Sequence, residues 1–571
     1  MACSAVLETI TLGMVALFAS AVSDPSAVIH SVYMNSLREV FSSEWFDTSK
    51  EMITNIGLVV VCLVGLKNCV KALVTYWIAR FGVSVEAYFG EMLLKGFLTL
   101  PYQWHLTRNS ADLVNAIQWR TYMGRYFLEP CLKVFDSTMM VFLMLTALLI
   151  VQPLVSLVVI GVIGSTAYLI FRVVRIKIDR VAAIARDYDL MINKEATMAI
   201  HGIKDVKIAQ KEDAFILRFL KNALPLAKIT GIQRFYGESP ALILETTGFA
   251  MLTLSLSLVL AVYDTSTAYI TGTIALLAVT AWKALPALAL VLSSSVTIRN
   301  ALPYISHQIG YLNEMEASAA RSVHGLTDSE DPLFFSRELK FDGVGFSYDP
   351  KDEETLKDIC FRIKRGEIIG VIGKSGAGKS TLIDLLIGLL EPGKGSIMID
   401  NMQLHSNNIS QWLSIIGYVP QSPYIYDGTL AENVAFGADR DTIDRQRVLE
   451  CCSMAAMDDF IHDMRDGVDS FIGERGIRLS GGQQQRVAIA RALYKHPEVM
   501  IFDEATSSLD NKSEKSIQDT IYSFKGKQTL IIIAHRLTTV RECDRLIWLD
   551  KGRIKMQGKP EDVLKEYNQV N

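Results

Sequence analysis

The first 310 residues alternate between long apolar runs and polar stretches, a pattern typical of helices that cross a membrane. Six runs each approach the ~20 residues that span a hydrocarbon core: 2–22, 53–78, 131–151, 154–171, 241–262 and 269–292. No Lys or Arg precedes the first run, whereas a secretory signal peptide requires a basic segment there. We therefore predict that residues 2–22 form the first of six transmembrane helices.

The connections between these runs differ in length and charge. Residues 79–130 and 172–240 form two long, helical-looking connections, whereas the turns at 152–153 and 264–268 are short and carry no Lys or Arg. Four basic residues follow the fourth run: Arg172, Arg175, Lys177 and Arg180. The positive-inside bias therefore places the long connections and both termini in the cytoplasm.

Each long connection contains a predicted break in its helix. Leu100-Pro101 ends one helix, and Asn109 has the side chain and the position to cap the next one. Gly202 interrupts the second connection. These breaks fit either ordinary solvated turns or the tips of helices that project beyond the bilayer to a soluble domain.

Residues 316–337 are polar, contain Gly325 and Pro332, and are predicted to form a linker. They separate a transmembrane domain, residues 1–315, from a soluble domain, residues 338–571. In the soluble domain strands, turns and helices alternate, as expected for an α/β fold.

Composition supports this division. The chain has 571 residues, too many for one core, and 50% of them are hydrophobic, with the surplus before residue 310. A net charge of −4 gives no indication of a nucleic-acid partner. The eight cysteines are scattered without a zinc-binding spacing, which favours free thiols in a reducing compartment.

A phosphate-binding loop of the form GxxxxGK[S/T] lies between a predicted strand, 368–372, and a predicted helix, 381–390. Its backbone N–H groups can surround phosphates, Lys379 can reach the β and γ oxygens, and Ser380 can hold Mg²⁺. This pattern predicts an ATP or GTP site made of Gly373, Lys374, Ser375, Gly376, Ala377, Gly378, Lys379, Ser380 and Thr381.

A second apolar strand, 499–502, leads into two acidic residues. Carboxylates at the end of a strand in such a sheet are placed to reach a phosphate-bound Mg²⁺. Asp503 is therefore the candidate Mg²⁺ ligand, and Glu504 is placed to polarise the attacking water.

The segment Leu479-Ser480-Gly481-Gly482-Gln483 precedes an apolar helical pattern and predicts a second helix N-terminus with accessible amides. With these motifs the chain resembles the ATP-binding cassette (ABC) superfamily, whose signature sequence is LSGGQ. The resemblance implies ATP and Mg²⁺ as ligands. It also implies a role for each of several residues: Tyr348 stacks on adenine, Gln421 senses Mg²⁺ and the attacking water, His535 contacts the γ-phosphate, Asp510 lies in the loop that crosses the dimer, and Gly473-Glu474-Arg475-Gly476 matches the exporter-specific loop.

The resemblance also implies an architecture. It is a membrane α-helical bundle of the ABC exporter type, with six transmembrane helices, followed by an α/β P-loop nucleotide-binding domain. Two cassettes would sandwich two ATP molecules, each phosphate loop facing the signature Ser480, Gly481, Gly482 and Gln483 of the other chain, so a homodimer or a dimer with a similar half is expected. The cassette would be cytoplasmic, on a bacterial inner or plasma membrane. The two helical breaks would act as coupling helices.

Looser patterns resemble bacterial lipid-linked oligosaccharide flippases: Glu8-Thr9-Ile10 and residues 71–81, 201–208 and 382–390. Relatives begin with a cytoplasmic helix that this sequence lacks. The implied function is an ATP-driven flippase. The alternatives are an exporter of drugs or peptides and an ATP-gated channel or regulator, although Glu504 and His535 favour a hydrolysing pump.

The second and the sixth run contain three lysines: Lys67, Lys71 and Lys283. Counted from the outer ends they lie at depths of very roughly 20 to 30 Å, where a lysine is costly unless it faces water, pairs or snorkels. We expect them to attract the anionic headgroup of a lipid substrate; snorkelling to the cytoplasmic interface is the alternative.

Overall fold

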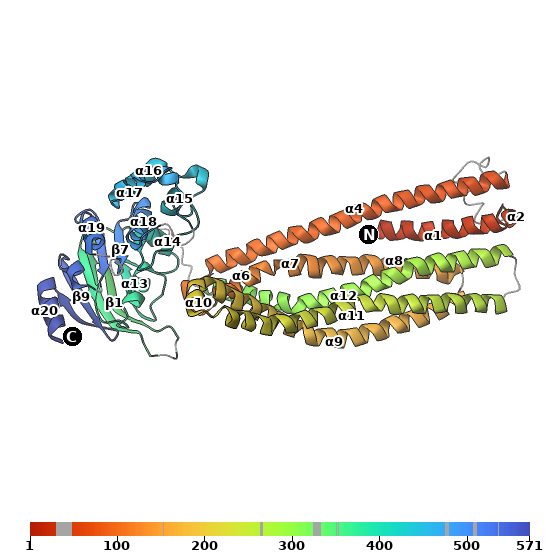
Figure 1. The fold of residues 1–571 in the computed structure, drawn as a ribbon, viewed down its shortest axis with the longest axis horizontal. Coiled ribbons are helices and arrows are strands. Elements are labelled where there is room, and N and C mark those ends of the chain that lie inside the picture. Colours follow the sequence, from red (N-terminus) through yellow and green to blue (C-terminus); the bar gives the residue numbers. More distant parts are fainter. Residues whose placement is uncertain are drawn as a thin grey trace. The chain divides into compact units, whose positions relative to one another are not determined.

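The computed structural model of the chain describes all residues except 30–47, 152, 263–266, 324–332, 350, 352, 474–478, 506–510, 535 and 571. It divides into two compact units, which are described separately (Figure 1). The first contains Met1–Leu100 and Arg108–Ala317. The second contains Pro101–Thr107 and Ser318–Asn571.

Long helices lie side by side in the first unit (Figure 1). They are α1 (Ala2–Ser23), α4 (Ser49–Thr99), α8 (Glu129–Val151), α9 (Pro153–His201), α11 (Glu212–Val262) and α12 (Thr267–Val323). The shorter segments of this unit are α2 (Pro25–Ile29), α6 (Ser110–Gln118), α7 (Arg120–Met123), a π-helical turn (Gly124–Leu128) and α10 (Ile203–Ala209). Each predicted apolar run lies on one of the long helices.

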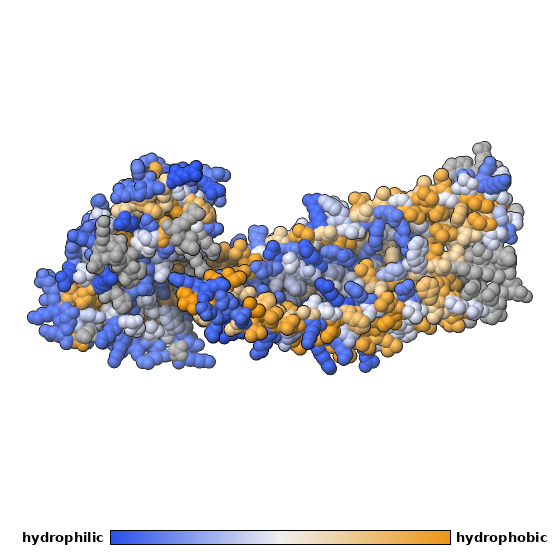
Figure 2. All heavy atoms as spheres, in the orientation of Figure 1, coloured by the Kyte–Doolittle hydropathy of each residue, from blue (hydrophilic) through white to orange (hydrophobic). Residues whose placement is uncertain are grey.

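The surface of the first unit explains its apolar composition. Large apolar side chains are exposed on it, among them Val61 at 71% and Phe142 at 67%, and hydrophobic residues gather there in Figure 2. Among the described residues, five helices are long and apolar enough to cross a membrane. The remaining predicted span, 241–262, lies on α11, where several outer side chains fall outside the described residues. Apolar side chains facing lipid account for this exposure.

The long helices also reach beyond a bilayer. α4 has 51 residues, about 75 Å of helix, whereas a hydrocarbon core is about 30 Å thick. α4 ends at Thr99, and α6 begins after Asn109, whose side-chain oxygen accepts the N–H of Ala111 at 2.9 Å. Gly202 separates α9 from α10. Both predicted helix breaks are therefore confirmed.

The first part of the predicted linker is helical. α12 continues through Val323 and so includes residues 316–323. Polar composition misled the prediction, because Glu316, Ala317, Ala319 and Ala320 are polar or small but favour helix.

The second unit contains two sheets covered by helices (Figure 1). The antiparallel sheet has the order β2-β1-β4-β5, and the other has the order β10-β9-β3-β8-β7-β6, parallel except at β10. The strands are β1 (Glu338–Phe346), β2 (Leu356–Lys364), β3 (Ile368–Ile372), β4 (Lys394–Ile399), β5 (Met402–Gln403), β6 (Ile416–Val419), β7 (Val499–Asp503), β8 (Thr529–Ile533), β9 (Arg545–Asp550) and β10 (Arg553–Gly558).

The helices of this unit are α5 (Tyr102–Leu106), α13 (Lys379–Ile387), α14 (Ile409–Ser414), α15 (Leu430–Val434), α16 (Arg445–Met454), α17 (Asp458–His462), α18 (Gly481–Tyr494), α19 (Asn511–Tyr522) and α20 (Pro560–Val570). The described part of this unit also contains 3₁₀ turns at Arg440–Thr442, Gly467–Asp469 and Leu537–Val540.

Alternation along the strands builds a core on each face of the parallel sheet. Ile368 and Ile372 of β3 join one buried cluster, while Ile369 and Val371 join the other. Since successive side chains of a strand point to opposite faces, a strand buried on both faces is apolar throughout, as β3 is.

This topology positions the candidate site. Parallel strands end at the same edge of their sheet, so the segments that follow β3, β6 and β7 meet there. These segments are the phosphate loop, Gln421 and Glu504.

Asp400, which follows β4, joins that strand to the start of β1. Its carboxylate accepts the backbone N–H groups of Ser336, Arg337 and Glu338, each at 2.8 Å. Burial raises the pKa of Asp400, but these three hydrogen bonds outweigh it and hold the pKa below its ordinary value.

We expect Asp400→Asn to lower the unfolding free energy of the second unit by about 1–2 kcal/mol at pH 7. A carboxyl group whose pKa is lowered by folding stabilises the folded state at pH values above its unfolded pKa of about 3.9. This stabilisation is lost as the pH falls through the lower pKa of the folded state. Thermal unfolding of the full-length protein at pH 7 and at pH values below about 3.9 measures it. Asp342→Asn, at an exposed position of β1, is the matched control. Equal midpoints for both variants at pH 7 would contradict this role.

Candidate functional site

The phosphate loop joins β3 to α13 as predicted. Gly376 and Gly378 have φ of +79° and +99°, which favours glycine, and a Cβ on Gly373 would lie 2.4 Å from the carbonyl oxygen of Leu549. α13 ends at Ile387, earlier than predicted, because Gly388 takes φ of +88° and caps it. The loop glycines are thus required by the backbone itself.

Lys379 lies inside this loop. Its side chain is only 7% exposed, and its Nζ donates to the carbonyl oxygens of Gly373 at 3.0 Å and Lys374 at 3.2 Å. The loop backbone thereby holds the ammonium group within the turn that would surround phosphates.

Glu504 faces Lys379 from the end of β7. Its Oε1 lies 4.0 Å from Lys379 Nζ, and its Oε2 accepts a hydrogen bond from Gln421 Nε2 at 2.8 Å. Glu504 has φ of +48°, uncommon for a residue with a side chain and typical of functional sites. The structure therefore brings three predicted site residues together.

Asp503 lies among other acidic groups. Burial, and then the charge of Glu504, raises the pKa of Asp503, while Tyr418 donates to its Oδ2 at 3.3 Å. Burial and the Asp503 charge raise the pKa of Asp384 to about 6. This edge of the sheet therefore holds more negative charge than Lys379 balances.

These residues fit Mg²⁺ and a nucleoside triphosphate. Among the described residues no group of three or more His, Cys, Asp or Glu could hold a metal ion alone. Mg²⁺ commonly binds through one or two protein oxygens plus substrate phosphates. Ser380, Asp503 and Gln421 would hold the ion, which would neutralise phosphate charge.

Tyr348 is in the second unit with the loop. Its ring is 42% exposed and meets Phe346 edge-on at 5.1 Å, and its hydroxyl hydrogen-bonds Thr381 Oγ1 at 3.0 Å. Its backbone oxygen accepts from Gln103 of α5 at 3.1 Å. An exposed ring beside the loop suits the predicted adenine contact, which stays a prediction.

The signature residues begin α18. Ser480 Oγ accepts the N–H of Gln483 at 3.3 Å, and Gln483 Oε1 accepts the N–H of Ser480 at 2.7 Å. This reciprocal capping box fixes the start of a 14-residue helix and leaves its first turn led by two glycines. Its contact with ATP from another chain stays a prediction.

Sequence reasoning missed Gln485 on the same helix. Gln485 is 2% exposed, and its Nε2 donates to the backbone oxygen of Gln421 at 2.8 Å. The signature helix therefore holds the segment that carries Gln421. The only signal in the sequence was that Gln485, a polar residue, lies on the apolar face of the predicted helix, three residues before Ala488.

Three predicted site features cannot be placed. His535, Asp510 and residues 474–476 of the exporter-specific loop lie outside the described residues.

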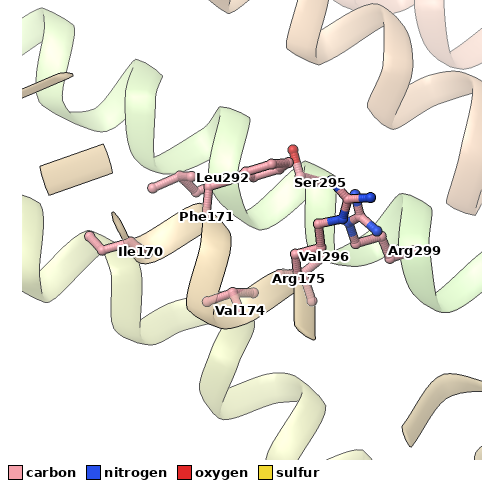
Figure 3. A pocket seen from close by; sticks show the side chains of 8 residues that line it. All are labelled: Ile170, Phe171, Val174, Arg175, Leu292, Ser295, Val296 and Arg299. Atoms are coloured by element: carbon pink, nitrogen blue, oxygen red, sulfur yellow. The ribbon is translucent and has the colours of Figure 1, made fainter. Parts of the chain in front are cut away.

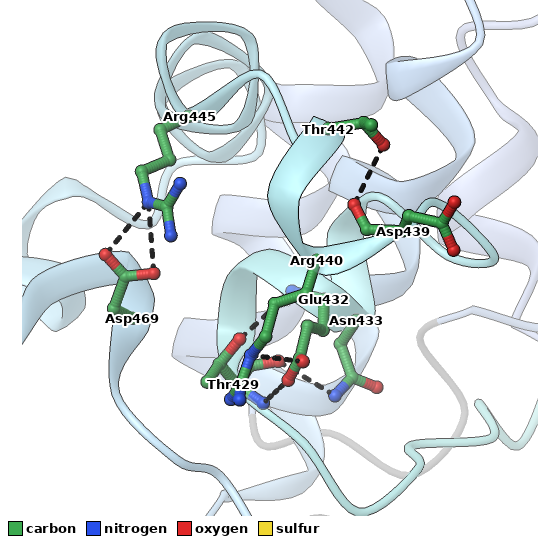
Figure 4. A network of polar contacts seen from close by, with 8 residues as sticks. All are labelled: Thr429, Glu432, Asn433, Asp439, Arg440, Thr442, Arg445 and Asp469. Carbon is green, nitrogen blue, oxygen red and sulfur yellow. Dashed lines mark hydrogen bonds and ion pairs between the residues drawn. The ribbon is translucent and has the colours of Figure 1, made fainter.

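Polar contacts order the helices between β6 and α18 (Figure 4). Thr429 and Glu432 form a capping box at the start of α15, and Arg440 pairs with Glu432 at 2.9 Å. Arg445 of α16 pairs with Asp469 at 3.1 Å. These contacts give α15, only five residues long, a fixed start.

The predicted lysines of the first unit have carboxylate partners. Lys67 Nζ lies 2.9 Å from Glu8 Oε2, Lys283 Nζ lies 3.4 Å from Glu8 Oε1, and Lys71 Nζ lies 2.6 Å from Asp136 Oδ2. The three lysines therefore have counter-ions within the first unit, and the sequence-based prediction had not assigned these partners. Whether a substrate also contacts the lysines stays a prediction.

A small apolar pocket lies between α8, α9, α11 and α12. Thr280, Ala281 and Ala284, the α12 neighbours of Lys283, line part of it.

A second, smaller groove lies between α9 and α12 (Figure 3). Its walls are mainly apolar, and the side chains of Arg175 and Arg299 lie close together at one end. Asp179 pairs with both, at 2.8 Å from Arg299 and 3.9 Å from Arg175.

Comparisons with known proteins agree with this geometry. Residues 356–507 match the family model described as ABC transporter. The chain is 40% identical over 228 residues to "ATP-dependent lipid A-core flippase" of Ralstonia nicotianae, covering 40% of this chain and 38% of that protein. It is 40% identical over 227 residues to "ATM1-type heavy metal exporter" of Novosphingobium aromaticivorans, covering 40% of this chain and 37% of that protein. The chain thus matches less than half the length of these curated relatives.

The fold extends the likeness to the whole chain. A solved structure of a bacterial Atm1-family ABC exporter with ATP bound matches 99% of this chain and 95% of that chain, with a TM-score of 0.73 and 24% identity. Residues 356–507 therefore belong to the ABC transporter family, and the chain as a whole has the fold of an ABC exporter.

Proposed function

We propose that two copies of this chain form an ATP-hydrolysing exporter that moves an amphiphilic lipid with an anionic headgroup out of the cytoplasmic leaflet of the plasma or inner membrane. A pyrophosphate-linked glycan carrier is the specific candidate. The observation that carries ATP hydrolysis is the approach of Lys379, Gln421 and Glu504 at one edge of the parallel sheet. Glu504 would orient and polarise the attacking water, and Lys379 would counter phosphate charge.

The substrate class is supported by features of the first unit. Three lysines and two acids within the predicted spans pair with one another, and charged residues in such spans usually serve a function. The small apolar pocket adjoins Lys283 on α12, so one helix presents both a cation and apolar surface. One relative is named as a lipid A-core flippase and another as a heavy metal exporter. Because these names differ in substrate, the substrate of this chain is a proposal.

The test is reconstitution of the full chain in phosphatidylcholine vesicles. We expect ATP to drive labelled pyrophosphate-linked glycan lipid to the outer leaflet and that lipid to stimulate ATPase, because the cation cluster favours an anionic headgroup. A zwitterionic lipid, a drug-like cation and a peptide serve as comparisons. Stimulation by the drug or the peptide alone would overturn the lipid assignment. ATP-dependent conductance without directional lipid movement would favour a channel.

A further inference from the structure

The Glu8 carboxylate is shared between two lysines from two other helices. Glu8 on α1 accepts from Lys67 on α4, with Nζ at 3.0 Å from Oε1 and 2.9 Å from Oε2. Lys283 on α12 reaches the same Oε1 at 3.4 Å. The side chains of Glu8 and Lys67 are 11% and 7% exposed, whereas that of Lys283 is 36% exposed.

This cluster carries one positive charge more than its carboxylate balances. Lys67 alone would neutralise Glu8, and a buried pair of this kind needs no second cation. Lys283 adds a charge inside a predicted span, where an unbalanced charge is costly. Lys283 also contacts the ring of Trp282, with Nζ 5.4 Å from the centroid.

The neighbouring pair provides a comparison within the same helix. Lys71 lies one turn after Lys67 on α4 and pairs one-to-one with Asp136 at 2.6 Å. If these charges served only to join helices, one acid for each lysine would suffice, as it does there. The second cation at Glu8 therefore points to a further anion.

We propose that Glu8 is a built-in counter-anion, which the anionic phosphate group of the transported lipid displaces from Lys67 and Lys283. This inference rests on the proposed function. The ligand first meets Lys283, the more exposed and more loosely held ammonium. Lysine suits such an exchange, because it is a point charge that attracts an anion without fixing one orientation. The small apolar pocket beside Thr280, Ala281 and Ala284 gives the apolar part of the lipid a surface to contact.

Because the phosphate group displaces Glu8 on binding, Glu8 can also promote release of the lipid. When the phosphate group leaves, Glu8 returns to both ammonium groups, so the empty site does not hold unpaired cations in the membrane. Glu8 thereby lowers the affinity for the ligand and favours its release.

The test measures binding of phosphatidic acid, the probe ligand, to the full-length protein in phosphatidylcholine nanodiscs. We expect Glu8→Gln to lower the half-saturating concentration of phosphatidic acid at least threefold, because the competing carboxylate is gone. Glu8→Asp should stay near wild type. Glu129→Gln, which removes an acid that pairs with Lys133 at 2.7 Å on α8, is the matched control and should change nothing. Unchanged affinity in folded Glu8→Gln protein would overturn the proposal.

If Glu8→Gln alone does not fold, a second pair of variants tests the proposal. The double variant Glu8→Gln, Lys67→Met removes the Glu8–Lys67 ion pair and leaves Lys283 as the one cation of this cluster. We expect this variant to bind phosphatidic acid, and addition of Lys283→Met to abolish that binding. Equal binding by the two would overturn the proposal. Transport of the glycan lipid is measured in parallel. If the protein does not transport this lipid but Glu8→Gln still shifts the affinity for phosphatidic acid, only the proposed function is contradicted.

Discussion

Glu504→Gln should reduce the ATPase rate by about 10²-fold or more while ATP still binds. Gln keeps the size of Glu and can still accept the hydrogen bond from Gln421, so the phosphate loop and the sheet edge are preserved. What is lost is the negative charge that, in the proposed role, would polarise the attacking water opposite Lys379. Turnover at saturating ATP, together with retention of labelled ATP by a closed dimer, measures both parts of this expectation.

Glu498→Gln is the matched control, because Glu498 directly precedes β7 and Glu504 directly follows it. Glu498 pairs with Arg365 on the surface at 3.1 Å, and we expect its substitution to leave ATPase unchanged within about twofold. Near-normal ATPase in Glu504→Gln would remove Glu504 from the assigned role.

Lys379→Ala and Ser480→Arg should each abolish turnover alone and restore part of it when the two chains are mixed. Lys379→Ala removes the ammonium held within the phosphate loop. Ser480→Arg breaks the capping box and places a bulky side chain at the start of α18. If a phosphate loop works with the signature of the other chain, a mixed dimer gathers both lesions in one site and leaves the other intact.

Random mixing at equal amounts would return about one quarter of the wild-type rate, provided that each site turns over independently. Two differently tagged Lys379→Ala chains, mixed in the same way, are the control and should stay inactive. Tandem affinity purification verifies that mixed dimers form. Absence of recovery in purified mixed dimers would count against the shared site.

Local sequence patterns predicted the second unit well, because the residues that define its strands, loop and helix ends are close together in the sequence. β3 was predicted with its observed bounds from five apolar residues, and the glycines of the phosphate loop are required by backbone geometry. Gly388 ended α13 three residues before the prediction, since a left-handed cap overrides an apolar pattern that continues to Leu390.

Pairing between distant residues could not be predicted from one sequence. Gln485 reaches the backbone of Gln421 across 64 positions, and Lys67 reaches Glu8 across 59. Both contacts depend on which helix faces or segments meet, and apolar periodicity leaves that open. Glu8 was visible as an acid in an apolar run, but the sequence could not show that two lysines share it.

The packing of α5 also sets where this chain can be cut and recombined with a related one. Residues 101–107 belong to the second unit by their contacts, although Leu100 and Arg108 on either side belong to the first. Gln103 donates to the backbone oxygen of Tyr348, an acceptor that any residue type at that position would provide. Whether the Gln103 side chain can reach this oxygen depends on the surrounding surface of the second unit. A chimera that exchanges only residues 318–571 would therefore inherit a mismatched patch, and one that also carries residues 101–107 from the donor would keep it intact.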